Sequence, residues 1–179
     1  YIELGKIKKI SKFRSGVGHD YSDDFESNRS MKHYFFPKDG IDWTSITIYS
    51  PVDGTIDRIF EEWAGKQVWI KVKNYSSFII RIFHINLVSS LHIGSYVTCG
   101  QQLGHHIGSQ TYSDIAIAQH IGSRIKLISY FEVMQDAVFM DYQMRGVDSR
   151  DKMIISKEYR DKNPPDWGSY DPNDWVILN

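Results

Sequence analysis

The chain has 179 residues, 41% of them hydrophobic, and its 21 basic and 22 acidic side chains leave a formal net charge of −1. This length suits one globular domain with a sizeable core. The near-zero net charge excludes a global electrostatic field that would attract nucleic acid or an anionic membrane. No stretch approaches the roughly 18 apolar residues of a membrane span. The single cysteine, Cys99, excludes an intrachain disulfide and a zinc site built on several thiolates, and we expect it to be a small buried strand residue.

The first 40 residues divide into a short strand and a long loop. The chain begins at Tyr1 rather than Met, as a trimmed or mature fragment does. Lysines alternate with isoleucines over residues 1–13, which predicts an entering strand with one solvated face. An edge strand at Tyr1–Ile10 would present unpaired backbone groups, through which copies of the chain could assemble. Ser15–Gly40 shows little periodicity and predicts a long loop, whose histidines and aromatic residues argue against disorder.

From Ile46 onward the pattern is that of a β-protein. Val68–Lys73 and Phe78–Leu87 flank a polar turn and predict a β-hairpin. Because side chains alternate along a strand, the second strand of this hairpin is expected to place four side chains on one face. These are Phe78, Ile80, Ile82 and His84.

The second half of the chain adds two strands, a helix and an arm. Ser113–Ala118 predicts a strand in which Asp114 faces away from the two isoleucines. Arg124–Met134 predicts a further strand, and a short helix is expected at Asp136–Arg145. The rest, residues 147–179, is charged and then rich in Pro and Trp. We expect it to form an arm packed on the domain or extending from it.

A histidine–aspartate pair lies in the predicted loop before these strands. His19 and Asp23 stand four residues apart, so both side chains can reach one ion when the backbone is extended or turned. Imidazole nitrogen and carboxylate oxygen are normal zinc donors, at about 2 Å. The pair is a candidate metal site, or else two hydrogen-bonding loop residues. His105 and His106, adjacent in a predicted turn, are expected at the surface.

Three glycine-spaced segments follow the pair in order. They are Ser50–Ile56 with its Pro-x-x-Gly turn, Phe83–Leu87 with His84 as its histidine, and the glycine run Gly94–Gly104. The whole order resembles the lysostaphin-like (LytM-type) zinc metallopeptidases. The resemblance implies an all-β fold, a two-sheet antiparallel β-sandwich of the lysostaphin-like peptidase type over residues 1–146, with a long N-terminal loop and an irregular C-terminal arm. It also implies an extracellular or cell-envelope location.

The last motif of that family, His-x-His, is missing here. Asp114–Ile117 or Ser129–Glu132 stands in its place, and neither contains a histidine. Catalytic zinc needs three protein ligands and an open position for the water that it acidifies. The resemblance implies zinc bound by His19 and Asp23, with Asp114 or the loop residue His33 as third ligand and His84 as base or transition-state stabiliser.

The loop also carries a basic and aromatic group that suits an anionic ligand: Arg29, Lys32, His33 and Tyr34. Such a group can bind a carboxylate or a sulfate and move a proton. Together with His19 and Tyr21 it is similar, by analogy of chemistry, to the His/Tyr acid–base sets of polysaccharide lyases. A solvated loop with aromatic anchors is the alternative interpretation.

Three functions remain open from the sequence. The first is a metal-assisted hydrolase of an extracellular polymer such as peptidoglycan. The second is a catalytically inactive module that binds or structures a polymer, or assembles with other proteins. The third is a metal-independent glycan-cleaving (lyase-type) enzyme that uses His33, Tyr34, Arg29 and His84. The expected partner is a polysaccharide or a peptidoglycan-like polymer, not nucleic acid.

Overall fold

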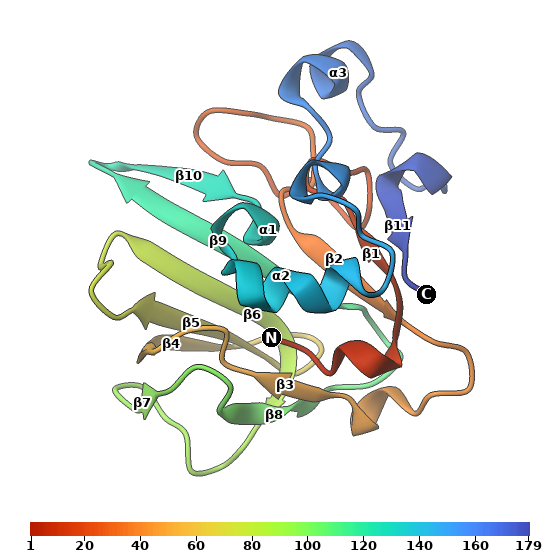
Figure 1. Ribbon diagram of the computed structural model, residues 1–179. Helices are drawn as coiled ribbons and strands as arrows, with labels where there is room; N and C mark the ends of the chain where they lie inside the picture. Colours follow the sequence, from red (N-terminus) through yellow and green to blue (C-terminus); the bar gives the residue numbers. More distant parts are fainter.

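The computed structural model describes residues 1–179, which form mostly antiparallel strands (Figure 1). The strands are β1 (Ile7–Ser11), β2 (His33–Pro37), β3 (Thr47–Tyr49), β4 (Gly54–Glu61), β5 (Lys66–Val72), β6 (Phe78–Leu87), β7 (Tyr96–Val97), β8 (Gln102–His106), β9 (Ser113–Ile121), β10 (Arg124–Ile128) and β11 (Trp175–Ile177). The α-helices are α1 (Tyr130–Val133), α2 (Asp136–Gln143) and α3 (Lys157–Lys162). None of the helices is both long enough and apolar enough to cross a membrane.

Hydrogen bonds join the strands into one network of eleven, in the order β11-β1-β2-β9-β6-β5-β4-β7. β10 adds to β9, and the β3–β8 pair joins the end of β6. Antiparallel pairing throughout bears out the predicted lysostaphin-like all-β class. The predicted arm, residues 147–179, contains α3 and β11, and β11 extends the sheet beyond β1.

The central strands β6 and β9 bury side chains on both faces. Ile82 and Ile115 belong to the main core, which also holds Phe131 of α1 and Phe139 of α2. Figure 1 shows these two helices in front of β9 and β6. On the opposite face, Phe83 packs in a second cluster of buried residues, and this cluster is closed by Phe13 and Met31 from the N-terminal segment. The predicted strand periodicity therefore assigns both faces correctly along most of β6 and β9.

The β5–β6 hairpin and the α2 helix lie where they were predicted. The predicted long loop Ser15–Gly40 was wrong at its C-terminal end, where β2 forms and pairs with β9. Cys99 lies exposed in a turn rather than buried in a strand. His106 is buried rather than exposed, at 1%.

The predicted strand Arg124–Met134 was also wrong beyond Ile128, because a helix starts there. Ser129 accepts a hydrogen bond from the backbone N–H of Phe131, and the Glu132 carboxylate accepts one from the N–H of Ser129. This Ser-x-x-Glu capping box is a signal for the start of a helix. It was present in the sequence and outweighs the strand propensity of the aromatic residues beside it.

We expect Ser129→Ala to lower the free energy of unfolding by about 1–2 kcal/mol, because it removes the cap and a hydrogen-bond partner of a buried histidine. Urea denaturation measures the change. Ser76→Ala, in the exposed β5–β6 turn, is the control and should stay within about 0.5 kcal/mol. Equal effects of the two substitutions would contradict the capping role.

Candidate functional site

A β-bulge near the end of β6 sets the position of His84. Lys66 of β5 pairs with Ile85 and Val68 pairs with Ile82, so two residues of β6 lie opposite one of β5. His84 takes up this extra residue with a φ of 58°, in the left-handed region that is uncommon for a side chain other than Gly. The bulge turns its imidazole away from Ile82. The predicted shared face was therefore wrong at this one residue.

The turn between β4 and β5 holds the imidazole of His84 from one side. Nδ1 lies 3.0 Å from the carbonyl oxygen of Ala64, to which it donates, and 3.3 Å from Oε2 of Glu62. Trp63 stacks edge-on against the ring, with 5.7 Å between ring centroids. A donating Nδ1 leaves Nε2 directed at the other partner, Asp114, whose Oδ1 is 3.6 Å away.

Asp114 lies on β9 with no exposed surface, and a lysine neutralises it. Its Oδ2 accepts a 2.8 Å hydrogen bond from Nζ of Lys32, whose side chain is also buried. The ammonium lies 3.6 Å from the ring centroid of Phe83 and 4.3 Å from that of Tyr21. Aromatic faces thus replace part of the water that a lysine normally keeps. Oδ1 of Asp114 has no hydrogen-bond partner within the protein.

These groups line a pocket of about 440 Å³ at the end of β6. The lining residues are Gly18, His19, Lys32, Tyr34, Glu62, Trp63, His84, Ser109, Gln110, Thr111, Tyr112 and Asp114. The imidazoles of residues 19 and 84, far apart in the sequence, therefore reach one pocket. Gly18 is required beside Tyr34: its φ is 79°, and a Cβ there would lie 2.4 Å from the tyrosine oxygen.

The pKa values of two pocket groups, Tyr34 and Glu62, are raised. Burial raises the pKa of the Tyr34 phenol far above its ordinary value, and the nearby Asp114 charge raises it further. The raised pKa keeps the phenol neutral, and its oxygen has no hydrogen-bond partner within the protein. Burial also raises the pKa of Glu62, with the charge of Asp114 adding to the effect and His84 opposing it.

Four of the predicted site residues do not line this pocket. Tyr21 accepts a hydrogen bond from Arg81, and its ring faces the ammonium of Lys32. Asp23 accepts hydrogen bonds from the backbone N–H groups of Phe25, Glu26 and Leu127, which fastens the loop to β10. Arg29 forms ion pairs with the carboxylates of Glu26 and Asp161. His33 is 1% exposed, between the carbonyl of Ser11 and the hydroxyl of Ser129. The lyase-type set is therefore not assembled: only Tyr34 and His84 of its members share the pocket.

The predicted zinc ligands do not fit a zinc site in this structure. No group of three or more His, Cys, Asp or Glu side chains is arranged to hold a metal ion. Asp23 is engaged by backbone amides, Asp114 by Lys32, and the alternative ligand His33 lies in the core. Of the proposed donors, His19 alone is exposed at the pocket without a competing cation.

The sequence reasoning missed Glu62, Trp63 and Tyr112. Glu62 and Trp63 belong to the β-hairpin turn between β4 and β5, and no motif in the sequence marks this turn as part of a site. Its glycine, Gly65, has a φ of 74°, and a Cβ there would lie 3.0 Å from the carbonyl oxygen of Ile85. This close approach seats the turn against the bulge, and only the β4–β5 pairing reveals it.

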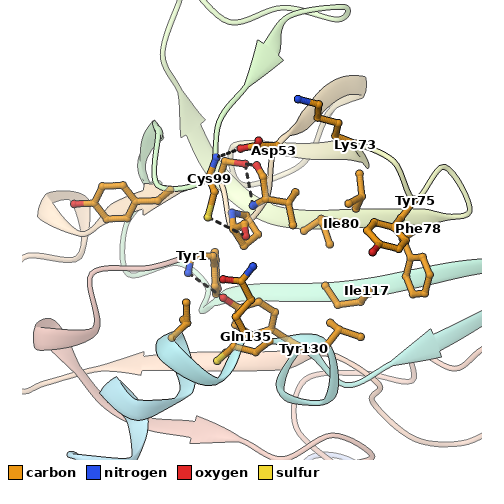
Figure 2. Close-up of a pocket in the computed structure, with 18 of the residues that line it drawn as sticks. Tyr1, Asp53, Lys73, Tyr75, Phe78, Ile80, Cys99, Ile117, Tyr130 and Gln135 are labelled. Atoms are coloured by element: carbon orange, nitrogen blue, oxygen red, sulfur yellow. Dashed lines mark hydrogen bonds between the residues drawn. The ribbon is translucent and has the colours of Figure 1, made fainter.

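A larger cavity, of about 1090 Å³, lies on the other face of the sheet (Figure 2). Ile80 and Ile117 form part of its wall, and Tyr130 of α1 closes one side. Cys99 lies at its edge, with its amide bonded to the carboxylate of Asp53. None of the predicted site residues lines this cavity, which is mostly apolar.

We expect Lys32→Met to lower the free energy of unfolding by about 3–5 kcal/mol, because it leaves the Asp114 carboxylate buried and unpaired. Adding Asp114→Asn should restore most of that loss, and urea denaturation of the two variants measures both effects. Lys8→Met is the control, since its ion pair with Asp39 is solvent-exposed and is worth at most about 1 kcal/mol. A double variant no more stable than the single one would contradict the pairing.

The burial of His33 predicts a pH dependence of stability. Desolvation lowers its pKa from 6.5 to about 4, so the unfolded chain binds more protons between these values and folding weakens as the pH falls. Between about pH 7 and about pH 4.5 the wild type should lose about 2 kcal/mol more than His33→Asn. Urea denaturation at both pH values tests this, with His92→Asn, at the surface, as a control that keeps the wild-type slope. A parallel slope in His33→Asn would refute the assignment.

The fold resembles solved structures at low sequence identity. The NMR structure of lysostaphin matches with a TM-score of 0.43 and 15% identity over 61% of this chain, which spans 46% of that one. A mutant catalytic domain of the prophage-encoded M23 protein EnpA from Enterococcus faecalis matches at 0.47 and 14%, over 69% of this chain and 88% of that one. A chain of the SpoIIQ–SpoIIIAH pore-forming complex matches at 0.50 and 13%, over 77% and 91%.

Neither a protein-family model nor a curated protein matches the sequence. At these identities the likeness to the solved structures concerns the fold alone. The chain has a divergent lysostaphin-like (LytM-type) fold, as the order of its sequence motifs predicted.

Proposed function

We propose that this chain is a metal-free lysostaphin-like module that binds an extracellular polymer, a polysaccharide or peptidoglycan, without cleaving it. The observation that carries the proposal is the buried ion pair between Lys32 and Asp114. It occupies the one carboxylate of the pocket that was a candidate zinc ligand. The proposed location, outside the cell or in the cell envelope, follows from such a polymer.

Charge and geometry support a pocket that works without zinc. A divalent ion on Asp114 would sit within a few ångströms of the Lys32 ammonium, and two like charges at such distances repel strongly where water is excluded. Lys32 is held by the carboxylate and by two aromatic faces, and its side chain is only 4% exposed. The ammonium therefore supplies the positive charge that balances Asp114.

The rim of the pocket supports ligand binding. Trp63 is 76% exposed although it stands directly over His84. An exposed indole beside a pocket suits stacking against an apolar sugar face, since it offers a large rigid surface with one polar N–H. His19, Gln110 and Tyr112 add polar atoms around it. The left-handed backbone of His84 is the kind of costly conformation that clusters at functional sites.

A sedimentation assay with purified peptidoglycan tests the proposal. The protein should pellet with the polymer in the presence of a chelator, release no soluble fragments and contain no stoichiometric zinc by elemental analysis. Trp63→Ala should weaken binding about tenfold, the loss expected of an aromatic anchor. Tyr159→Ala, an exposed aromatic substitution on α3, is the matched control and should bind like the wild type.

Two results would overturn the proposal in favour of an enzyme. Fragment release that stops with chelator, from a protein that carries one zinc per chain, would indicate the metal-assisted hydrolase. Fragment release that resists chelator but is lost in His84→Ala would indicate a metal-independent enzyme. No pelleting with any polymer, combined with a concentration-dependent oligomer, would favour an assembly module.

A further inference from the structure

The cavity on the α1 face of the sheet has room for a ligand of its own. Its volume of about 1090 Å³ is at the upper end of the range for small-molecule sites. Ile80 of β6 and Ile117 of β9, both buried, form part of the wall, and Phe78 and Tyr130 lie at its sides (Figure 2). The His84 pocket lies on the opposite face of the β6–β9 layer. A ligand in the cavity would therefore bind apart from the polymer.

The buried polar side chains of this cavity are already bonded within the protein. The hydroxyl of Ser50 donates a 2.6 Å hydrogen bond to the carbonyl oxygen of Val52, and the hydroxyl of Tyr1 lies 3.0 Å from Oγ of Ser113. None of the buried polar side-chain atoms that lack a partner belongs to the lining of the cavity, whereas three of them belong to residues that line the His84 pocket. A ligand in the cavity therefore gains mainly from burying apolar surface.

Such a wall favours a hydrocarbon chain over a peptide. A peptide that entered the cavity would remove its amide groups from water, and no buried side chain of the lining has a free donor or acceptor to replace the lost hydrogen bonds. An amide left without a partner opposes binding. A hydrocarbon chain has no polar group to satisfy, so the same wall binds it without this cost.

The mouth of the cavity is also apolar, apart from a few polar side chains. Tyr75, Val133 and Val138 are 66%, 46% and 37% exposed there, so apolar surface faces water at the entrance. Lys73 is exposed beside them, and its ammonium lies 5.6 Å from the ring centroid of Tyr96 without forming an ion pair. A ligand with an anionic head would meet an unpaired cation at this end.

Asp53 is the only carboxylate of the lining. Its Oδ1 accepts a 2.8 Å hydrogen bond from the backbone N–H of Cys99. This bond holds the carboxylate against its own loop, whereas the long side chain of Lys73 is free to turn toward a head group. The charges at the mouth therefore favour an anionic head at the lysine.

We infer that this cavity binds a fatty acid, with its hydrocarbon chain against Ile80 and Ile117 and its carboxylate at Lys73. The inference goes beyond the proposed function, since it assigns a second ligand to the opposite face of the sheet. Cys99 offers a reporter of occupancy: it is the only cysteine of the chain, it is exposed, and it lines the cavity.

Calorimetric titration of the full chain with laurate, below the concentration at which laurate forms micelles, tests the inference. Binding should be saturable and should show a negative heat-capacity change, the mark of buried apolar surface. Saturating laurate should also slow the alkylation of Cys99 by iodoacetamide at least fivefold, as followed by mass spectrometry. Ser123→Cys in a Cys99→Ser background places the thiol in the exposed β9–β10 turn, where laurate should not change the rate.

A charge at the mouth should block the chain. Val138→Asp should weaken the binding of both laurate and the neutral dodecanol about tenfold, because the new carboxylate would have to lose water against the hydrocarbon. Ala137→Asp is the matched control: it adds the same charge to the same turn of α2 at an exposed residue outside the lining, and it should bind like the wild type. Both variants should keep their Tm within about 2 °C of the wild type, since an acidic residue suits the first turn of a helix.

The head group is tested separately at Lys73. Dodecanol should bind the wild type about three- to fivefold more weakly than laurate, the range expected of an exposed ion pair. Lys73→Gln should lower the affinity for laurate by the same factor and leave that for dodecanol unchanged. Lys71→Gln, at an exposed position of β5 outside the lining, is the control and should leave both affinities unchanged.

Several outcomes would overturn the inference. Absence of saturable binding, unchanged binding in Val138→Asp, or equal slowing of the two thiols would remove the cavity as the site. Equal affinities for laurate and dodecanol would refute the anionic head. Protection of Cys99 by an apolar peptide as strong as that by laurate would refute the hydrocarbon chain. Protection by phosphatidylglycerol vesicles but not by laurate would indicate a membrane surface in place of a free fatty acid.

Discussion

The buried ion pair between Lys32 and Asp114 is the interaction on which the site depends. It joins the residue that precedes β2 to β9 across 82 positions of sequence, and both side chains are buried. Such a pair holds its geometry strongly, because moving either partner leaves a bare charge in a low dielectric. It also balances the charge of Asp114, so this carboxylate is already paired with a cation inside the pocket. The ion pair is therefore the feature of the site from which the proposal of a metal-free module starts.

The bulge in β6 is the second constraint, and it works together with the first. Without it, His84 would continue the alternation of the strand and join the main core. With it, the imidazole lies between Glu62 and Asp114, each within 3.6 Å, and under an exposed indole. The left-handed backbone of His84 is kept because the β4–β5 turn closes on it from one side and β9 supports it from the other. The histidine is thus held in one orientation.

The two faces of the β6–β9 layer have different tasks. One face carries the larger, apolar core and the cavity beside α1. The other carries the polar pocket and unpaired donors of Arg81 and Trp69, covered in part by the N-terminal loop. A buried charge without a partner weakens folding, whereas the buried Arg29 and Arg160 are paired with Asp161 and Asp174.

Local sequence determined the hairpin, the α2 helix, the alternation of β9 and the motif order that indicated the fold, because each depends on residues close together in the chain. A capping box at Ser129 was equally readable and was overlooked. Only the tertiary structure decided the site. A bulge depends on the register between two strands, and the choice of Lys32 as partner of Asp114 depends on β2 lying beside β9. Neither strand pairing produces a periodic pattern in the sequence. The spacing of the residues therefore could not predict which side chains meet at the site.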